Sequence, residues 1–181
     1  MPDAITLLAT LALNQAQYGG FTMMEDFIAD YIHRHQLRFS TLSDAIWDTP
    51  ETRFAETRSS ALLSDALAEE GFRVERGVGG IDTAFIASAG SGKPVIAILG
   101  EFDALAGLSQ QAGCARPQPL EANGNGHGCG HNLLGTAGVA AACAVKAWME
   151  QHHTGGTVSL LRLPWRRRRF GQDFYGARRA V

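Results

Sequence analysis

The chain has 181 residues, of which 45% are hydrophobic, and a formal net charge of −2, a composition typical of globular proteins. The near-zero charge gives no reason to expect nucleic acid or an anionic membrane as a partner. No apolar run approaches the roughly 18 residues of a membrane span, and Asp3 stands where a secretory signal needs positive charge. Cys114, Cys129 and Cys143 are odd in number and predict no disulfide framework, so we expect a reducing, cytoplasmic setting.

Two helices are predicted in the first third of the chain. Apolar residues recur mostly at helical spacing over residues 25–46, with a break near Ser40. His33 and His35 fall within this pattern beside arginines, and we interpret them as residues of the solvated face. The second helix lies in SSALLSDALAEEGF, where serines can cap its start and Gly71 marks its end.

Strands follow these helices. FRVERGV and DTAFIAS are typical of short strands, and the continuous apolar run Val95–Leu99 suits a strand buried on both faces. GSGK, at Gly90–Lys93, is not a phosphate loop, because Pro94 follows the lysine and the loop precedes a strand instead of a helix. We interpret it as a turn.

An alanine-rich helix is predicted from Leu133 to about His152, with Asn132 as its N-cap. His152 and His153 stand where cations suit the dipole of the helix C-terminus. Helices, then strands, then another helix predict an α/β fold.

Two groups of polar residues could carry chemistry. Glu101 and Asp103 directly follow the apolar strand, and the ligand sites of open α/β sheets lie at such strand ends. In HGCGH, Cys129 and His131 are also two residues apart and precede a helix, so a thiolate and an imidazole could bind one metal ion there. Two further interpretations stay open: a glycine-rich loop with an inert cysteine, or a nucleophilic cysteine with His127 or His131 as its base.

The motifs IWDTPETRF, GKPVIAILGEFDALAGLSQQAGCA and NGHGCGHNLLGTA resemble those of the M20 family of metal-dependent amidohydrolases and peptidases, over roughly Met24 to Val158. The resemblance implies the N-terminal part of a three-layer, zinc-peptidase-like catalytic domain of the aminopeptidase type. It also implies two divalent ions, zinc or manganese, in the complete enzyme. Cys129 and His131 map to metal ligands, and Asp103 maps to the position that supports the metal site.

The same resemblance implies hydrolysis of p-aminobenzoyl-glutamate or a similar acyl-amino-acid amide. The family's general base is the first of a Glu-Glu pair, and further histidine ligands lie downstream. No glutamate follows Val158, so we expect an incomplete enzyme that is inactive alone. The alternative is a noncatalytic metal-binding or subunit-interaction module that works beside an A-type hydrolase subunit.

The ends of the chain differ from its middle. Residues 1–23 have no counterpart in the resemblance, and we interpret them as an extension before a natural start at Met23 or Met24. Residues 24–158 form the M20-like part. In residues 159–181, seven of 23 residues are arginine, which is typical either of a basic arm that contacts phosphates or of a shifted reading frame.

We expect a frameshift close after Val158. Trp165 is encoded by TGG, so reading one nucleotide later gives a glycine codon across the junction with Arg166. Synonymous codons for Leu163 to Arg178 then permit CPGEEGGSGKTFMVR, which contains the missing Glu-Glu pair. Sequencing the coding DNA tests this hypothesis, and early stop codons or a shifted frame without Glu-Glu would contradict it.

Overall fold

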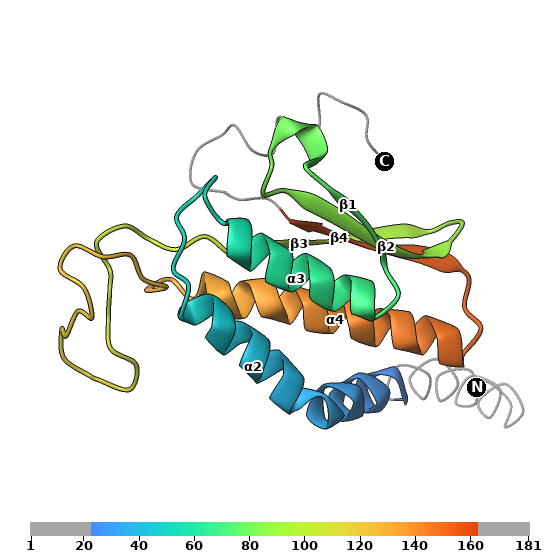
Figure 1. Cartoon of the computed structure of the whole chain (residues 1–181). Coiled ribbons are helices and arrows are strands. Elements are labelled where there is room, and N and C mark those ends of the chain that lie inside the picture. Colours follow the sequence, from blue (N-terminus) through green and yellow to red (C-terminus); the bar gives the residue numbers. More distant parts are fainter. Residues whose placement is uncertain (1–22, 163–181) are drawn as a thin grey trace, which may run out of the picture.

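The computed structural model describes residues 23–162 (Figure 1), so the predicted extension lies outside the described residues except for Met23. The chain is helical from residue 23 to 34, turns at His35 and continues as α2 (Gln36–Trp47). The helix therefore breaks at His35, not near Ser40. His33 is exposed as predicted, whereas His35 lies between two aromatic rings, 4.4 Å from that of Tyr31 and 6.3 Å from that of Phe39.

The second predicted helix is α3 (Thr57–Glu69). Its N-cap residue is Glu56, so the prediction that a serine caps this helix is wrong. The carboxylate of Glu51 instead accepts hydrogen bonds from the backbone N–H groups of the first turn. Gly71 follows the helix with a φ of +82°, a conformation that favours glycine, and the predicted end is confirmed.

Four strands form one sheet in the order β1-β2-β4-β3. They are β1 (Arg73–Arg76), β2 (Phe85–Ser91), β3 (Val95–Gly100) and β4 (Gly156–Arg162), with the short 3₁₀ helix η1 (Val78–Gly80) between the first two. β2 pairs antiparallel with both β1 and β4, whereas β3 pairs parallel with β4. Gly90 and Ser91 of GSGK end β2, and Gly92 and Lys93 form the predicted turn into β3.

The long helix α4 (His131–Gln151) connects β3 to β4 and so completes a β-α-β unit. Its N-cap is Gly130, whose φ of +77° is one that glycine adopts readily. The prediction of Asn132 as the N-cap is wrong, because Asn132 lies inside the first turn and is buried. Its Nδ2 donates a hydrogen bond to Ser43 Oγ of α2, at 3.0 Å.

Helices α3 and α4 pack against the sheet, and α2 packs against both of them (Figure 1). The hydrophobic core lies between these elements. Its largest fully buried apolar side chains contribute about 1.5–3 kcal/mol each; they are Phe85, Phe102, Ile46, Leu63, Leu67, Leu160, Val139 and Val158. This arrangement confirms the α/β fold.

Strand β3 differs from its prediction. It pairs with β4 on one side only, because it stands at the edge of the described sheet. Val95, Ile96 and Leu99 are also 46%, 57% and 56% exposed, so burial on both faces is wrong for the described residues. An exposed apolar edge of this kind is a site where another chain can pair.

Strand β4 passes through the domain boundary predicted at residue 158, and Leu160 is fully buried. The remainder of the predicted basic tail, residues 163–181, lies outside the described residues. Within residues 23–162, every helix is too short or too polar to cross a membrane.

Candidate metal centre

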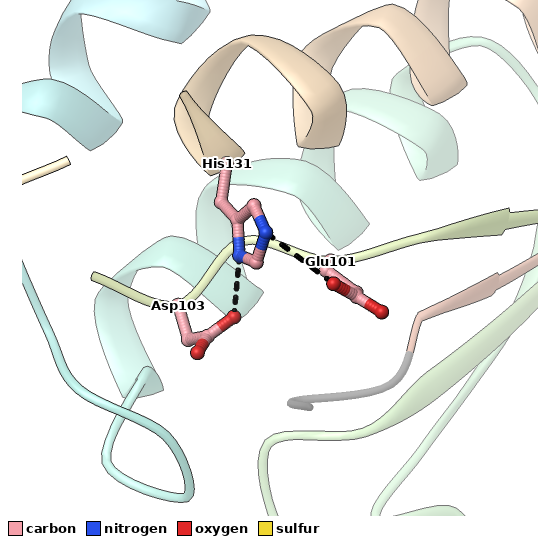
Figure 2. A group of neighbouring side chains, drawn as sticks. All are labelled: Glu101, Asp103 and His131. Carbon is pink, nitrogen blue, oxygen red and sulfur yellow. Dashed lines mark hydrogen bonds and ion pairs between the residues drawn. The ribbon is translucent and has the colours of Figure 1, made fainter. Parts of the chain in front are cut away.

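Three potential metal ligands converge where β3 ends and α4 begins. Glu101 and Asp103 follow the last residue of β3, and His131 is the first residue of α4. Figure 2 shows the imidazole of His131 lying between the two carboxylates. In residues 23–162, this group can hold a metal ion, because its ligand atoms all lie within 4.8 Å of one another.

Both ring nitrogens of His131 contact a carboxylate. Nδ1 lies 2.7 Å from Asp103 Oδ1, and Nε2 lies 3.3 Å from Glu101 Oε2 (Figure 2). The site is largely shielded from water, because the side chain of Asp103 is 4% exposed, that of His131 12% and that of Glu101 15%. Low exposure strengthens electrostatic interactions within the group.

This donor set fits a divalent cation. A neutral imidazole has a single N–H, so when Nδ1 donates to Asp103 the lone pair of Nε2 is directed to the side of Glu101. Two acceptors facing each other repel unless a cation or a proton lies between them. A carboxylate that holds Nδ1–H while Nε2 binds metal is the common arrangement around histidine ligands. Asp103 therefore suits an orienting role, and Glu101 and His131 suit direct ligation.

A third acid, which the sequence interpretation missed, lies near this group. Glu56 is fully buried, and its Oε2 accepts a hydrogen bond of 3.0 Å from Thr83 Oγ1. Burial, with a smaller contribution from the nearby charge of Asp103, raises the pKa of Glu56 to about 7 against the opposing effect of the Thr83 bond. No spacing in the sequence distinguishes Glu56 from the exposed Glu69 of α3.

The structure separates the two residues predicted as metal ligands. His131 belongs to the convergent group, whereas Cys129 is exposed and lies outside it. The role of Cys129 as a ligand stays a prediction. His127, interpreted as an alternative base in the loop, is 3% exposed, and burial lowers its pKa.

The other cysteines behave as packing residues. Cys143 is buried in α4, and burial raises the pKa of its thiol to about 11, so it stays protonated and unreactive. Cys114 is half-buried in the loop that follows β3, where its Sγ donates to Gln118 Oε1 at 3.4 Å.

His152 caps the end of α4 and stacks on Trp148 with ring centroids 3.7 Å apart.

The loop between β3 and α4 connects Asp103 to His131. Its two ends pair through the bridge between Leu105 and Gly126. A side chain at Gly126 would place its Cβ 1.9 Å from the carbonyl oxygen of Leu108, so only glycine permits this approach. A cavity of about 610 Å³ lies within this loop, and Leu108, Arg116 and Gly128 are among its lining residues.

The fold occurs in solved metallopeptidases. The YXEP protein of Bacillus subtilis, a dinuclear metal binding peptidase from the M20 family, matches with a TM-score of 0.63 at 21% identity. The match covers 82% of this chain and 41% of that protein. At this level of identity the likeness shows the fold alone.

Sequence comparison is more decisive. The B subunit of p-aminobenzoyl-glutamate hydrolase from Escherichia coli (strain K12) is 57% identical over 148 residues, which are 82% of this chain and 31% of that protein. The chain belongs to the M20 family. The resemblance stated from its motifs is thereby confirmed, although no family model matches the chain.

A second relative is more distant. The Xaa-Arg dipeptidase of Mus musculus is 33% identical over 132 residues, 67% of this chain and 27% of that protein. The chain thus spans about a third of the length of the curated relatives it matches.

The burial of Glu56 predicts a pH-dependent stability. Its pKa is about 7 in the folded chain, against 4.5 for the ordinary group. Between these values the folded chain keeps a proton that the unfolded chain loses, so the free energy of unfolding falls as the pH rises through this window. Glu56 alone accounts for a loss of about 3 kcal/mol.

Denaturant unfolding with a chelator present, at pH 5 and pH 8, measures this loss. Glu56→Gln should flatten the decline, because the amide carries no proton to release. Glu121→Gln, in an exposed part of the loop, should decline as the wild type does. An equal decline in the wild type and Glu56→Gln would show that Glu56 is not the group responsible.

Proposed function

We propose that this chain provides the first part of a divalent metal site in an amidohydrolase that cleaves p-aminobenzoyl-glutamate or a similar acyl-amino-acid amide. The convergence of Glu101, Asp103 and His131 at the end of β3 is the observation that carries this proposal. The name of the E. coli relative supports the substrate, and the metal content named for YXEP supports the cation.

Glu101 and His131 would hold the cation, and Asp103 would orient the imidazole. A bound divalent cation supplies Lewis acidity toward an amide carbonyl and toward water. Two carboxylates and an imidazole suit either manganese or zinc, and the thiolate of Cys129 in addition would favour zinc. We propose zinc with Cys129 as a ligand, because Cys129 lies two residues before His131 and a thiolate is a preferred ligand of zinc.

Catalysis also requires a general base. We infer that the Glu-Glu pair implied by the resemblance supplies it, and that the 181-residue chain binds metal without hydrolysis. Release of p-aminobenzoate from p-aminobenzoyl-glutamate by the zinc-loaded or manganese-loaded chain, abolished by Cys129→Ala, would contradict this inference.

A second candidate function rests on the edge of the sheet. The exposed apolar side chains Val95, Ile96 and Leu99 of β3 suit contact with another polypeptide. The E. coli relative is named as one subunit of a hydrolase, so a subunit-interaction module is the alternative. Stable association with an A-type subunit, without any binding of metal, would favour this alternative.

Alkylation of cysteines tests the metal site directly. Zinc should slow the reaction of iodoacetamide with Cys129 at least tenfold, because a ligating thiolate is neither free nor accessible. Cys114 is the internal control and should react at an unchanged rate. Peptide mass mapping measures both rates in one sample, and His131→Ala should abolish the protection. An unchanged rate at Cys129 with saturating zinc would remove it from the ligand set.

A further inference from the structure

One segment contacts both parts of the chain that carry the candidate metal ligands. This connector, residues 46–56, runs from the end of α2 to the start of α3 and contains the whole motif IWDTPETRF. The backbone N–H of Ala104, next to Asp103, donates to Glu51 O at 2.8 Å. The side chains of Asn125 and His127, in the loop that leads to His131, contact the carbonyl oxygens of Pro50 and Ile46 at 3.0 and 3.1 Å.

The connector is fixed by its own carboxylate. Glu51 Oε2 accepts hydrogen bonds of 2.9 Å from both the backbone N–H and the hydroxyl of Ser59, and Oε1 accepts from the N–H of Arg58 at 3.0 Å. These bonds satisfy N–H groups at the first turn of α3 that have no partner within the helix. The carboxylate of Glu51 therefore ties the connector to the start of α3.

His127 makes the most buried of these contacts. Its acceptor is a carbonyl, so Nε2 carries the proton and donates to Ile46 O. The ring is 3% exposed, and Nδ1 has no hydrogen-bond partner among the described residues. A buried polar ring that forms one directed bond fixes the position of its backbone strongly, because breaking that bond leaves two buried polar groups unpaired.

The chain between His127 and His131 needs such an anchor. Two of its three residues are glycines, and Gly130 adopts a φ of +77° immediately before α4. Glycine has the largest conformational freedom of all residues, so these residues do not fix the direction of His131 by themselves.

We propose that His127 is a positioning residue of the metal centre: through its bond to Ile46 O, supported by Asn125 on Pro50 O, it holds the glycine-rich loop so that His131 faces Glu101 and Asp103. The proposal rests on the proposed function, since it requires a cation at that site. It gives IWDTPETRF the role of a template to which both ligand-bearing segments are bound.

Two substitutions at His127 separate positioning from packing. His127→Phe keeps a ring of similar size but removes the donor, whereas His127→Gln keeps an N–H donor at a similar reach. The probe is Co²⁺ alone, titrated into the metal-free 181-residue chain and followed by its visible absorption. Thermal unfolding with a chelator present measures the stability of each metal-free variant.

We expect His127→Phe to weaken Co²⁺ binding about 10–100-fold, as substitutions behind histidine ligands do, and His127→Gln to stay within about threefold of the wild type. The two metal-free variants should unfold at similar temperatures. Asn125→Ala, at a half-buried loop position, should weaken binding less than His127→Phe, and it gives a second reading if the phenylalanine variant does not fold.

Wild-type affinity for Co²⁺ in both His127→Phe and Asn125→Ala would overturn the positioning role and leave the proposed metal site intact. Equal weakening by His127→Phe and His127→Gln would also overturn it, because the donor would then be irrelevant. A wild-type chain that leaves the Co²⁺ spectrum unchanged would instead contradict the proposed function itself, and the positioning role with it.

Discussion

The parallel pairing of β3 with β4 through α4 determines where every candidate ligand lies. A β-α-β unit returns the chain across the sheet, so the end of its first strand and the start of its helix meet at the same edge. Glu101 and Asp103 leave that strand end, and His131 opens that helix. The convergence of acids and imidazole is therefore a consequence of topology, which the connector between α2 and α3 then refines through hydrogen bonds to both segments.

The same convergence is electrostatically costly. Asp103 and Glu56 are buried acids whose charges act on each other, and His131 contacts a carboxylate through each ring nitrogen. The carboxylates of this group repel one another when they are charged. Apolar surroundings do not reduce that repulsion, whereas a bound divalent cation would. Clusters in which burial and like charges perturb titratable groups are typical of functional sites and rare where only stability is selected.

The sequence permits much of this structure to be predicted, for identifiable reasons. The run Val95–Leu99 is continuously apolar, as in a strand, and the later segment is alanine-rich, as in a helix. Glu101, Asp103 and His131 stand at the boundaries of these two elements. Pairing is not encoded locally, so the exposure of β3 at the sheet edge was not predictable from its apolar run. Cys129 is exposed in the structure, and its role as a second ligand beside His131 stays a prediction from their spacing.

Contacts between distant segments account for the other differences. His127 is a loop residue as predicted, but its burial was not predictable, because its partner Ile46 lies 81 positions away in the sequence. Asn132 has a side chain that often caps helices, yet here it is buried and donates a hydrogen bond to Ser43 of α2. In both cases a tertiary hydrogen bond overrides a local preference.

X-ray absorption at the zinc edge, on the 181-residue chain loaded with one equivalent of zinc, tests the central claim most directly. The account predicts nitrogen and oxygen ligands at roughly 2.0–2.2 Å and one sulfur ligand at roughly 2.3 Å, together with outer-shell scattering from an imidazole that His131→Ala removes. The control His33→Ala, at an exposed position, should leave that scattering unchanged. A spectrum of hydrated zinc, or one that is identical in the wild type and His131→Ala, would contradict the assignment of this strand end as a metal centre.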